Sequence, residues 1–358
     1  MKIGIDVSQI VYGTGVSVYT KSLVESLLGI DRENEYILFG GSLRRIHDLR
    51  FMIQEYRAKK KIYTLPPTAL DLLWNRLHII PIETFTGKLD VYHSSDWAQA
   101  PSNAFKVTTI HDLVPFKFPK QTHPRILAVH KARFKWIRKE VDVVIAVSQS
   151  TKQDLIDLGI DEKKIRVVYE AAGEKFVPQK KDVISETLKR FGIRENYLIS
   201  VGFGPRKNTK KLIEAFQKIK TKNLKLVLVG RRQERIAERG VMTLGRVDSD
   251  QDLAALYSGA EALVYPSLYE GFGLPVVQAM AVGCPVVTSN VSSLPEVAGD
   301  AAVLVNPNDT SSIAEGIQTA LRQTKSLAQK GLKQAQKFSW EKAAQETFGI
   351  YKTAASKI

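Results

Sequence analysis

The chain has 358 residues, enough for two domains that each bury a hydrophobic core of their own. It carries 52 Lys and Arg residues against 37 Asp and Glu residues, and this formal net charge of +15 indicates an anionic ligand or surface as partner. A single cysteine, Cys284, excludes intramolecular disulfide bonds, and the chain has neither a signal-peptide pattern nor an apolar run of about 18 residues. We therefore expect a soluble protein of the reducing cytoplasm.

The first half of the chain alternates short apolar runs with helical patterns. We predict strands at residues 2–7, 36–39, 61–65, 89–93, 107–110, 141–147 and 166–169. This alternation indicates a parallel sheet covered by helices on both faces, where ligands gather at the carboxyl ends of the strands. Polar segments lie at three such ends: the segment that contains His93 and Asp96, the pair His111 and Asp112, and residues 148–150. A glycine turn with Gly15 also follows the first strand. A plain turn, a structural histidine and a helix cap are the alternative explanations.

Positive charge is concentrated between residues 101 and 140, where nine Lys and Arg residues accompany two acidic residues. Residues 123–139 fit an amphipathic helix. One side of this helix carries Leu127, His130, Phe134 and Ile137, and another side carries Lys131, Lys135 and Arg138. Two interpretations stay open: a helix that rests on an anionic membrane, and a solvated basic face over a packed apolar stripe. Nucleic acid is disfavoured as a partner because the sequence has no basic motif with interleaved aromatic residues.

A second α/β region follows residues 176–190, a segment of loose pattern that we interpret as a linker. Its predicted strands are residues 197–201, 224–229, 262–265, 285–289 and 302–305. After the first of these strands, Arg206 and Lys207 precede a predicted helix at 210–220. Two fixed cations beside a helix start would stabilise a departing diphosphate. A solvated basic cap on the helix is the alternative.

The stretch 265–290 reads as strand, glycine loop, helix and strand. Gly271 and Gly273 let the backbone approach a ligand closely, and the helix that starts near Pro275 directs free N–H groups and its positive dipole end to the same place. The pattern predicts a phosphate site, with Glu270 able to accept hydrogen bonds from sugar hydroxyls. The alternative is a tight turn whose glycines serve only backbone geometry.

Two other charged segments have simpler explanations. We interpret Arg231, Arg232 and Arg235 as a basic helix face. Asp248 and Asp250 form the Asp-x-Asp pattern of some metal-dependent transferases, but they also lie where a helix needs an N-cap and an acidic first turn. We prefer the cap.

The sequence Glu270-Gly-Phe-Gly-Leu-Pro, with a helix that ends in Ala-Val-Gly-Cys-Pro-Val-Val, resembles the donor-binding segment of GT-B retaining glycosyltransferases. More closely, it resembles glycosyltransferase family 4 (glycosyl transferases group 1), whose Pro-Arg-Lys-Asn sequence is present at 205–208. The resemblance covers nearly the whole chain. It implies an α/β protein of the GT-B fold, with two Rossmann-like domains whose parallel sheets face an interdomain cleft. Residues 1–176, completed by a C-terminal helix at 340–358, would form the acceptor-side domain, and residues 177–339 the nucleotide-sugar-binding domain.

The same resemblance implies roles for individual residues. In the family's Glu-x7-Glu motif, Glu270 would contact the transferred sugar, and Gln278, in place of the second Glu, would hold the ribose through weaker hydrogen bonds. Lys207 matches the family's diphosphate-binding lysine, with Arg206 beside it, in a turn about one residue shorter than usual. His111 would lie near the reacting centre, able to bind a sugar hydroxyl or to help move the acceptor proton. Further donor contacts are implied for Gly15, Gly271, Phe272, Gly273 and Leu274, and His93, Asp96 and Asp112 are candidates for acceptor contact.

We therefore expect a retaining, metal-independent glycosyltransferase that uses no cofactor. It would move mannose or glucose from a nucleotide diphosphate sugar to a hydroxyl of a glycan or lipid-linked acceptor, in cell-surface polysaccharide or glycolipid synthesis. No carboxylate is placed as a covalent nucleophile, which favours a same-face displacement. A basic first domain would suit peripheral contact with the inner face of the membrane. Two alternatives stay open: an isomerase like the nucleotide-sugar 2-epimerases of the same fold, and a non-enzymatic protein that binds anions or RNA.

Overall fold

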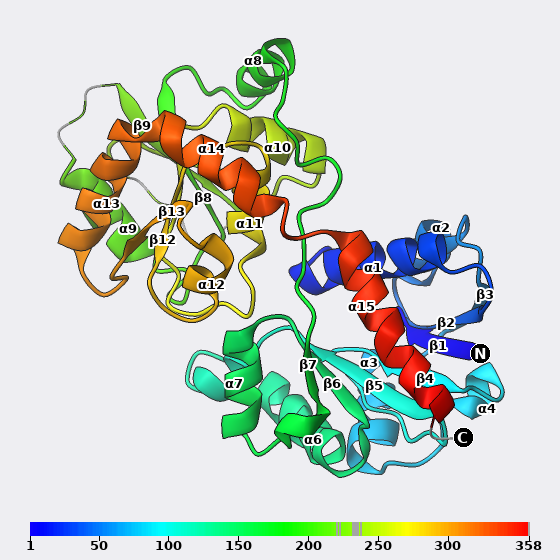
Figure 1. The fold of residues 1–358 in the computed structure, drawn as a ribbon. Coiled ribbons are helices and arrows are strands. Elements are labelled where there is room, and N and C mark those ends of the chain that lie inside the picture. Colours follow the sequence, from blue (N-terminus) through cyan, green and yellow to red (C-terminus); the bar gives the residue numbers. More distant parts are fainter. Residues whose placement is uncertain (220, 222, 231–235, 237, 357–358) are drawn as a thin grey trace. The chain divides into compact units, whose positions relative to one another are not determined.

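The computed structural model describes residues 1–219, 221, 223–230, 236 and 238–356. The chain forms two compact units, each a parallel sheet with helices on both faces (Figure 1). Unit 1 contains Met1–Glu170 and the C-terminal segment that begins at Trp340, and unit 2 contains Ala171–Ser339. The chain thus leaves unit 1 after Glu170 and returns to it at Trp340.

Unit 1 is organised around a seven-stranded sheet of order β3-β2-β1-β4-β5-β6-β7, in which every neighbouring pair is parallel. Its strands are β1 (Lys2–Asp6), β2 (Glu35–Gly41), β3 (Lys59–Tyr63), β4 (Val91–Ser94), β5 (Phe105–Ile110), β6 (Val143–Ala146) and β7 (Ile165–Val167). The central strands consist largely of buried aliphatic residues because helices cover both faces of the sheet. All seven strands predicted for this region are present.

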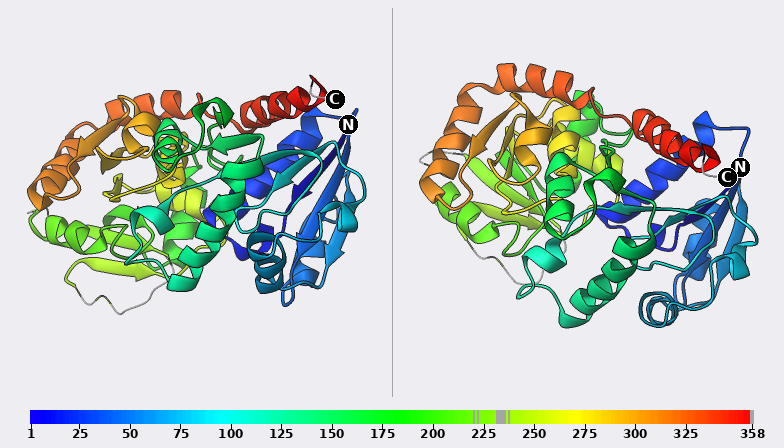
Figure 2. Two further views of the ribbon diagram at one scale, coloured as in Figure 1. Left: turned by 90° about the horizontal axis from the view of Figure 1, so that it is seen from below. Right: turned by 60° about the horizontal axis from the view of Figure 1, so that its bottom comes forward.

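The helices of unit 1 include the predicted amphipathic segment. They are α1 (Gly15–Ile30), α2 (Ile46–Ile53), α3 (Pro67–Leu70), α4 (Glu83–Thr86), α5 (Val114–Lys117), α6 (Pro124–Glu140), α7 (Gln149–Asp157) and α15 (Trp340–Lys352), with short 3-10 or π turns at Ile10–Tyr12, Asp71–Arg76, Glu162–Lys164 and Thr353–Ser356. A capping box of Thr14 and Ser17 starts α1 at Gly15. Helix α15 packs against α1 (Figure 2). The rings of Tyr19 and Trp340 lie 5.6 Å apart at this contact.

Unit 2 is organised around a six-stranded sheet of order β10-β9-β8-β11-β12-β13, again with parallel pairs only. Its strands are β8 (Asn196–Val201), β9 (Leu224–Val229), β10 (Val241–Leu244), β11 (Ala262–Tyr265), β12 (Val286–Ser289) and β13 (Ala302–Val305). Strand β10 was not predicted, because its alternation of Met and Thr with aliphatic residues lacks the continuous apolar run of a buried strand. It lies at one edge of the sheet.

Unit 2 has seven helices in the described part of the chain. They are α8 (Lys181–Arg190), α9 (Thr209–Gln217), α10 (Asp250–Ser258), α11 (Leu274–Ala281), α12 (Leu294–Ala298), α13 (Thr310–Arg322) and α14 (Thr324–Ala335). Residues 176–190, interpreted from the sequence as a linker, contain the whole of α8, so that interpretation was wrong for the second part of the segment. Ser249 caps α10, with Asp250 and Asp252 in its first turn, as the cap interpretation predicted. The arginines at 231, 232 and 235 lie outside the described residues.

None of the helices in the described part of the chain has the length and apolar character needed to cross a membrane.

Candidate active site

Two turns of unit 2 lie side by side because β8 and β11, the strands that precede them, are neighbours in the sheet. The first turn, residues 202–208, leads into α9, and the second, residues 266–273, leads into α11. A backbone hydrogen bond joins them, from the N–H of Leu268 to the carbonyl of Arg206 (2.9 Å). The sheet therefore brings the two predicted donor segments together, although they are about 60 residues apart in sequence.

The first turn depends on residues with positive φ. Gly202 has a φ of 90°, and a Cβ at this position would lie 3.1 Å from Cε of Lys207, so glycine lets the lysine stem pass close to the backbone. Asn208 has a φ of 59°, and its amide donates to the carbonyls of Pro266 (3.1 Å) and Pro307 (2.6 Å). These bonds fix the turn and, with it, the direction of the lysine side chain.

Arg206, Lys207 and Glu270 form an ionic cluster centred on one carboxylate oxygen. Oε1 of Glu270 lies 2.8 Å from Nη1 of Arg206 and 2.6 Å from Nζ of Lys207. The same oxygen accepts hydrogen bonds from the hydroxyls of Ser267 (2.6 Å) and Tyr265 (2.9 Å). Three residues predicted to contact the donor therefore meet at one place.

The ionic cluster sets the charge of its own carboxyl group. Burial by itself would raise the pKa of Glu270, but the charges of Lys207 and Arg206 and the hydrogen bonds from Lys207 and Ser267 lower that pKa to about 2. Glu270 is therefore a carboxylate at neutral pH. Because one negative charge faces two positive charges, the cluster keeps a net positive charge that suits an anionic ligand.

Two serines hold the loop that carries Glu270. The hydroxyl of Ser292 accepts a hydrogen bond from the N–H of Glu270 (3.1 Å), and the hydroxyl of Ser293 lies 2.9 Å from the carbonyl of Glu270 and 2.7 Å from that of Phe272. Both serines precede α12. Sequence reasoning did not single them out as site residues, and their only local signal is the helix start that they mark.

The start of α11 completes this side of the site. Gly273, with a φ of 110°, precedes the first helical residue, Leu274, and a Cβ at Gly273 would lie 2.9 Å from Cδ2 of Leu294. Gly271 lies in the buried loop that leads into this turn. Gln278 is buried on α11, and within the described residues its amide makes no hydrogen bond. Its contact with a ribose stays a prediction.

In unit 1, His93 is enclosed by the protein. Its Nδ1 lies 2.6 Å from the hydroxyl of Tyr351 on α15, and its Nε2 lies 2.9 Å from Oγ1 of Thr109 on β5. Burial, with smaller contributions from His111 and Arg133, lowers the pKa of His93 to about 3, so the ring is neutral. This geometry explains His93 as part of the packing of α15 on the sheet and counts against contact with an acceptor.

His111 follows β5 and pairs with a residue that sequence reasoning did not find. Its Nδ1 lies 3.0 Å from Oε1 of Glu170, the last residue of unit 1 before the chain enters unit 2. Tyr19 packs its ring edge-to-face on the imidazole, with centroids 4.4 Å apart. The two partners are 59 residues apart, and nothing in the local sequence marks Glu170 as a partner of a histidine.

The two aspartates near His111 have structural partners. Asp112 accepts a hydrogen bond from the N–H of Val114 (2.9 Å) at the start of α5, which fits the cap alternative. Asp96 forms an ion pair with Arg133 (3.3 Å), a fully buried residue of α6 that also donates to Thr108 (2.7 Å). Arg133 is one of the nine basic residues counted between residues 101 and 140, and the structure places it inside unit 1.

Comparison with known proteins shows the family to which the chain belongs. A family model for glycosyl transferases group 1 matches residues 184–338, and a model for glycosyltransferase family 4 matches residues 13–171. The O-antigen chain mannosyltransferase B of Escherichia coli is 32% identical over 289 residues, which cover 73% of this chain and 74% of that protein. The chain is a family 4 glycosyltransferase.

Further comparisons agree on the family and the fold. The O-antigen chain mannosyltransferase RfbU of Salmonella typhimurium is 30% identical to this glycosyltransferase over 226 residues, 59% of each chain. The sucrose-phosphate synthase of Thermosynechococcus elongatus superposes with a TM-score of 0.75 and 19% identity and covers all of both chains. This structural likeness confirms the GT-B fold, with two Rossmann-like α/β domains.

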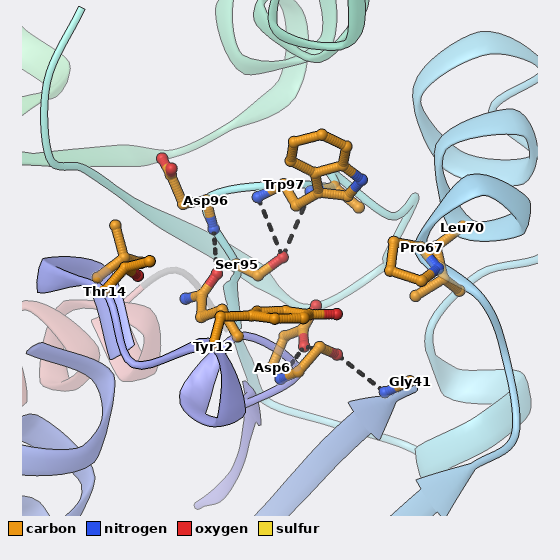
Figure 3. Close-up of a pocket in the computed structure, with 13 residues that line it drawn as sticks. Asp6, Tyr12, Thr14, Gly41, Pro67, Leu70, Ser95, Asp96 and Trp97 are labelled. Atoms are coloured by element: carbon orange, nitrogen blue, oxygen red, sulfur yellow. Dashed lines mark hydrogen bonds between the residues drawn. The ribbon is translucent and has the colours of Figure 1, made fainter. Parts of the chain in front are cut away.

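Unit 1 of the glycosyltransferase also contains a cavity of about 410 Å³ (Figure 3). Residues from the ends of β1, β2 and β4, from the turn before α1 and from α3 surround it, and they include Asp6, Tyr12, Thr14, Gly41, Pro67, Leu70, Ser95, Asp96 and Trp97. Burial raises the pKa of Asp6, against hydrogen bonds from Ser8 that lower it. Gly15 is exposed at the start of α1, next to the lining residue Thr14. Aromatic rings beside carboxyl groups are suited to a sugar, whose faces are apolar and whose rim carries hydroxyls.

Among the described residues of the glycosyltransferase, no three His, Cys, Asp or Glu side chains converge as a metal site. Asp248 is paired with Arg246 (2.5 Å), and Asp250 belongs to the first turn of α10. The helix cap thus accounts for the Asp-x-Asp pattern, while the expectation of metal-independent catalysis stays a prediction.

Proposed function

We propose that this glycosyltransferase transfers mannose from a nucleotide diphosphate sugar to a hydroxyl of a glycan or lipid-linked acceptor, with retention of the anomeric configuration. The observation that carries the proposal is the ionic cluster of Arg206, Lys207 and Glu270 at the starts of α9 and α11. Two O-antigen chain mannosyltransferases among its relatives favour mannose as the sugar and surface polysaccharide as the product class.

The cluster has the charge that departure of a diphosphate requires. As the glycosidic bond of the donor breaks, negative charge develops on the leaving phosphate, and the fixed cations Arg206 and Lys207 stabilise it without reorganising. Because these side chains supply the positive charge, the proposed reaction needs no metal ion. Glu270 keeps both cations in place before the donor binds and offers carboxylate oxygens to the sugar hydroxyls.

A retaining mechanism without a covalent intermediate follows from the state of Glu270. A carboxylate whose Oε1 pairs with two cations and accepts two hydroxyl hydrogen bonds is a weak nucleophile, because these partners stabilise its negative charge and hold its pKa at about 2. We therefore propose same-face attack by the acceptor hydroxyl, with its proton passing to the departing phosphate. The carbon–oxygen bond to the phosphate breaks as the bond to the acceptor forms.

For the acceptor we propose the cavity of unit 1, where Tyr12 and Trp97 provide apolar surfaces and Asp6 and Asp96 provide hydrogen-bond acceptors. Asp96 also lines the small cavity beside His111, so the proposed acceptor site and the imidazole share a boundary residue. This placement retains Asp96 as an acceptor contact, whereas His93 and Asp112 serve the packing described above.

The membrane contact is proposed from two adjoining features of unit 1. Helix α6 exposes the cations Lys131, Lys135, Arg138 and Lys139. Next to it, the segment 71–80 exposes Leu72, Leu77, Ile79 and Ile80, and Trp136 of α6 donates to the carbonyl of Asn75 (2.7 Å) in that segment. Apolar side chains beside cations suit an anionic lipid surface at the inner face of the membrane.

Vesicle sedimentation tests the membrane contact. We expect the protein to bind vesicles with anionic lipid, and the double variant Leu77→Ser with Ile79→Ser to lose most of that binding. Phe51→Ser, at an exposed apolar residue of α2, is the matched control and should bind as the parent does. Equal losses in both variants, or no binding by the parent, would contradict the proposed surface.

The donor proposal is tested by thermal stabilisation with GDP, UDP, ADP and dTDP, followed by turnover of GDP-mannose and UDP-glucose. We expect one nucleoside diphosphate to raise the melting temperature most, and this rise should persist in roughly 0.5 M salt. The nucleotide sugar with the same base should be turned over. Equal, salt-sensitive shifts from all four nucleotides would indicate charge-driven binding alone. Conversion of the donor to its 2-epimer without any acceptor would favour an isomerase and overturn the transfer reaction.

A further inference from the structure

The pair of His111 and Glu170 leaves one side of the imidazole unused by the protein. Nδ1 hydrogen-bonds to Oε1 of Glu170 at 3.0 Å, whereas Nε2 makes no hydrogen bond within the described residues. His111 follows the carboxyl end of β5, the edge of the sheet where ligands of parallel α/β proteins bind. It also lines a cavity of about 20 Å³ together with Gln9, Asp96 and Thr109, large enough for about one water molecule.

We propose that Glu170 is a positioning residue that holds His111 as a charged hydrogen-bond donor, with Nε2–H directed to the reacting substrate. This inference rests on the proposed transfer reaction. Glu170 lies outside every motif of the sequence. Of the two roles that the sequence left open for His111, the proposal keeps hydrogen bonding to the substrate and excludes movement of the acceptor's proton.

The geometry restrains the imidazole in two ways. Glu170 is buried, with 4% of its surface exposed, so water competes little with its hydrogen bond to His111. The Tyr19 ring lies edge-to-face on the imidazole, and its hydroxyl is held by Thr109 (3.0 Å). Rotation of the imidazole about its Cβ–Cγ bond would break the Glu170 contact and collide with Tyr19, so Nε2 keeps one direction.

The surrounding charges favour the doubly protonated ring. Burial by itself would lower the pKa of His111, but the hydrogen bond and charge of Glu170, with the charges of Asp96 and Asp112, raise it above its usual value of 6.5. The nearby bases His93 and Arg133 do not reverse this direction, and His93 is itself neutral. Burial raises the pKa of Tyr19 well above its usual value, so this phenol adds no charge near neutrality.

A charged imidazole has a definite chemical role. With both nitrogens protonated it cannot accept the acceptor's proton, so it does not act as a general base. It donates one hydrogen bond from Nε2, either to a sugar hydroxyl or to an oxygen on which negative charge develops, and it keeps its proton throughout. The acceptor's proton leaves with the phosphate instead.

The variant Glu170→Gln tests this role, because glutamine keeps the size and an oxygen acceptor but removes the charge. The active form is protonated, so activity is lost as the pH rises through the pKa of His111, and lowering that pKa moves the loss to lower pH. We expect kcat/KM to fall roughly tenfold at pH 8 and to stay within about twofold of the parent at pH 5.5. Glu170→Asp, which restores the charge, should recover part of the loss at pH 8.

Two further variants separate this role from a structural one. Glu140→Gln is the matched control, since Glu140 pairs with His78 (2.8 Å) in a second His–Glu pair of unit 1, and its pH profile should equal that of the parent. In a His111→Gln background, Glu170→Gln should have no further effect on kcat/KM. A pH profile that Glu170→Gln leaves unmoved, or a full additional loss in the His111→Gln background, would overturn the proposal.

The charge of His111 is also measured without activity. Titration of the ¹⁵N-labelled histidines by NMR, with the His111 signal assigned through His111→Gln, should show Glu170→Gln lowering its pKa. An unchanged titration would contradict the electrostatic role even in an active enzyme. If the parent turned over no nucleotide sugar while the titration shifted as expected, the transfer reaction would fail but the Glu170–His111 coupling would stand.

Discussion

The ionic cluster of unit 2 and the His111–Glu170 pair of unit 1 both join a buried carboxylate to a basic side chain, yet they differ in how they respond to protons. In unit 2, two cations and two hydroxyls converge on one oxygen of Glu270, and its pKa falls to about 2. In unit 1 a single carboxylate faces an imidazole, and it raises the pKa of that imidazole above the usual value of 6.5. The kind and number of basic side chains beside the carboxylate therefore decide whether the charge of a site changes with pH near neutrality.

This contrast assigns the pH dependence of the enzyme to unit 1. Glu270 does not titrate between pH 6 and pH 8, so the contribution of unit 2 to donor binding should be constant there. Variants in the ionic cluster should therefore change kcat/KM by the same factor at every pH in this range, whereas variants of the histidine pair should change the pH at which kcat/KM falls.

The largest expected effect comes from Lys207→Ala. Removing a cation that stabilises the leaving diphosphate in an enclosed site should lower kcat by roughly 10² or more, by the same factor at pH 6 and pH 8. Steady-state kinetics with GDP-mannose measure it. Lys211→Ala is the control, because Lys211 follows on α9 and donates to the carbonyl of Asn308 outside the cluster. Unchanged turnover, or a loss confined to one end of the pH range, would contradict a pH-independent role of the ionic cluster in turnover.

An intermediate effect is expected for the stability of Glu270→Gln, which leaves two cations without their shared counter-charge. The depressed pKa of Glu270 stabilises the folded state above its unfolded-state pKa near 4.5, and this stabilisation is lost as the pH falls towards 2. We expect the free energy of unfolding to drop by roughly 3 kcal/mol at pH 7 and by less at pH 3, in urea titrations. Glu214→Gln, on the exposed face of α9, should change it by less than about 0.5 kcal/mol. Equal losses at both pH values would show that the charge is not responsible.

The smallest expected effect is on nucleotide affinity in Gln278→Glu. A carboxylate accepts a stronger hydrogen bond from a ribose hydroxyl than an amide does, so the preferred nucleoside diphosphate should bind roughly fivefold tighter, a gain of about 1 kcal/mol. Isothermal titration calorimetry measures the change, with Gln251→Glu on α10 as the control. Weaker binding would mean that the buried pocket around α11 is adapted to a neutral amide.

The sequence was sufficient for features that are local. Buried aliphatic runs predicted β8 and β11, and glycine positions predicted the turns that follow them. The family resemblance assigned Arg206, Lys207 and Glu270 to one donor site, and the structure brings them together because β8 and β11 end at the same edge of the sheet. The ion pairs that join them depend on rotamers and on Ser267 and Tyr265, which periodicity does not encode.

What the sequence could not give are partners that only the tertiary structure brings together. Glu170 lies after a three-residue strand, and its contact with His111 depends on how β5, β6 and β7 are ordered in the sheet. Arg133 carries the charge of a surface residue, and only its bonds to Asp96 and Thr108 explain its burial on α6. The sequence made His93 a candidate for acceptor contact, but in the structure the hydroxyl of Tyr351, 258 residues away, contacts its Nδ1.

The return of the chain to unit 1 at Trp340 has a consequence for biosynthesis. Helix α15 buries Trp340 and Tyr351, and Tyr351 supplies the hydroxyl that His93 needs. A ribosome delivers residues 1–170 first, yet the surface of α1 that receives α15 has no cover until residues 340–352 have emerged. Unit 2 is one continuous segment and can close its core earlier. The half that is translated first is therefore the half that is completed last, and the nascent chain carries an open apolar surface on α1 throughout the synthesis of unit 2.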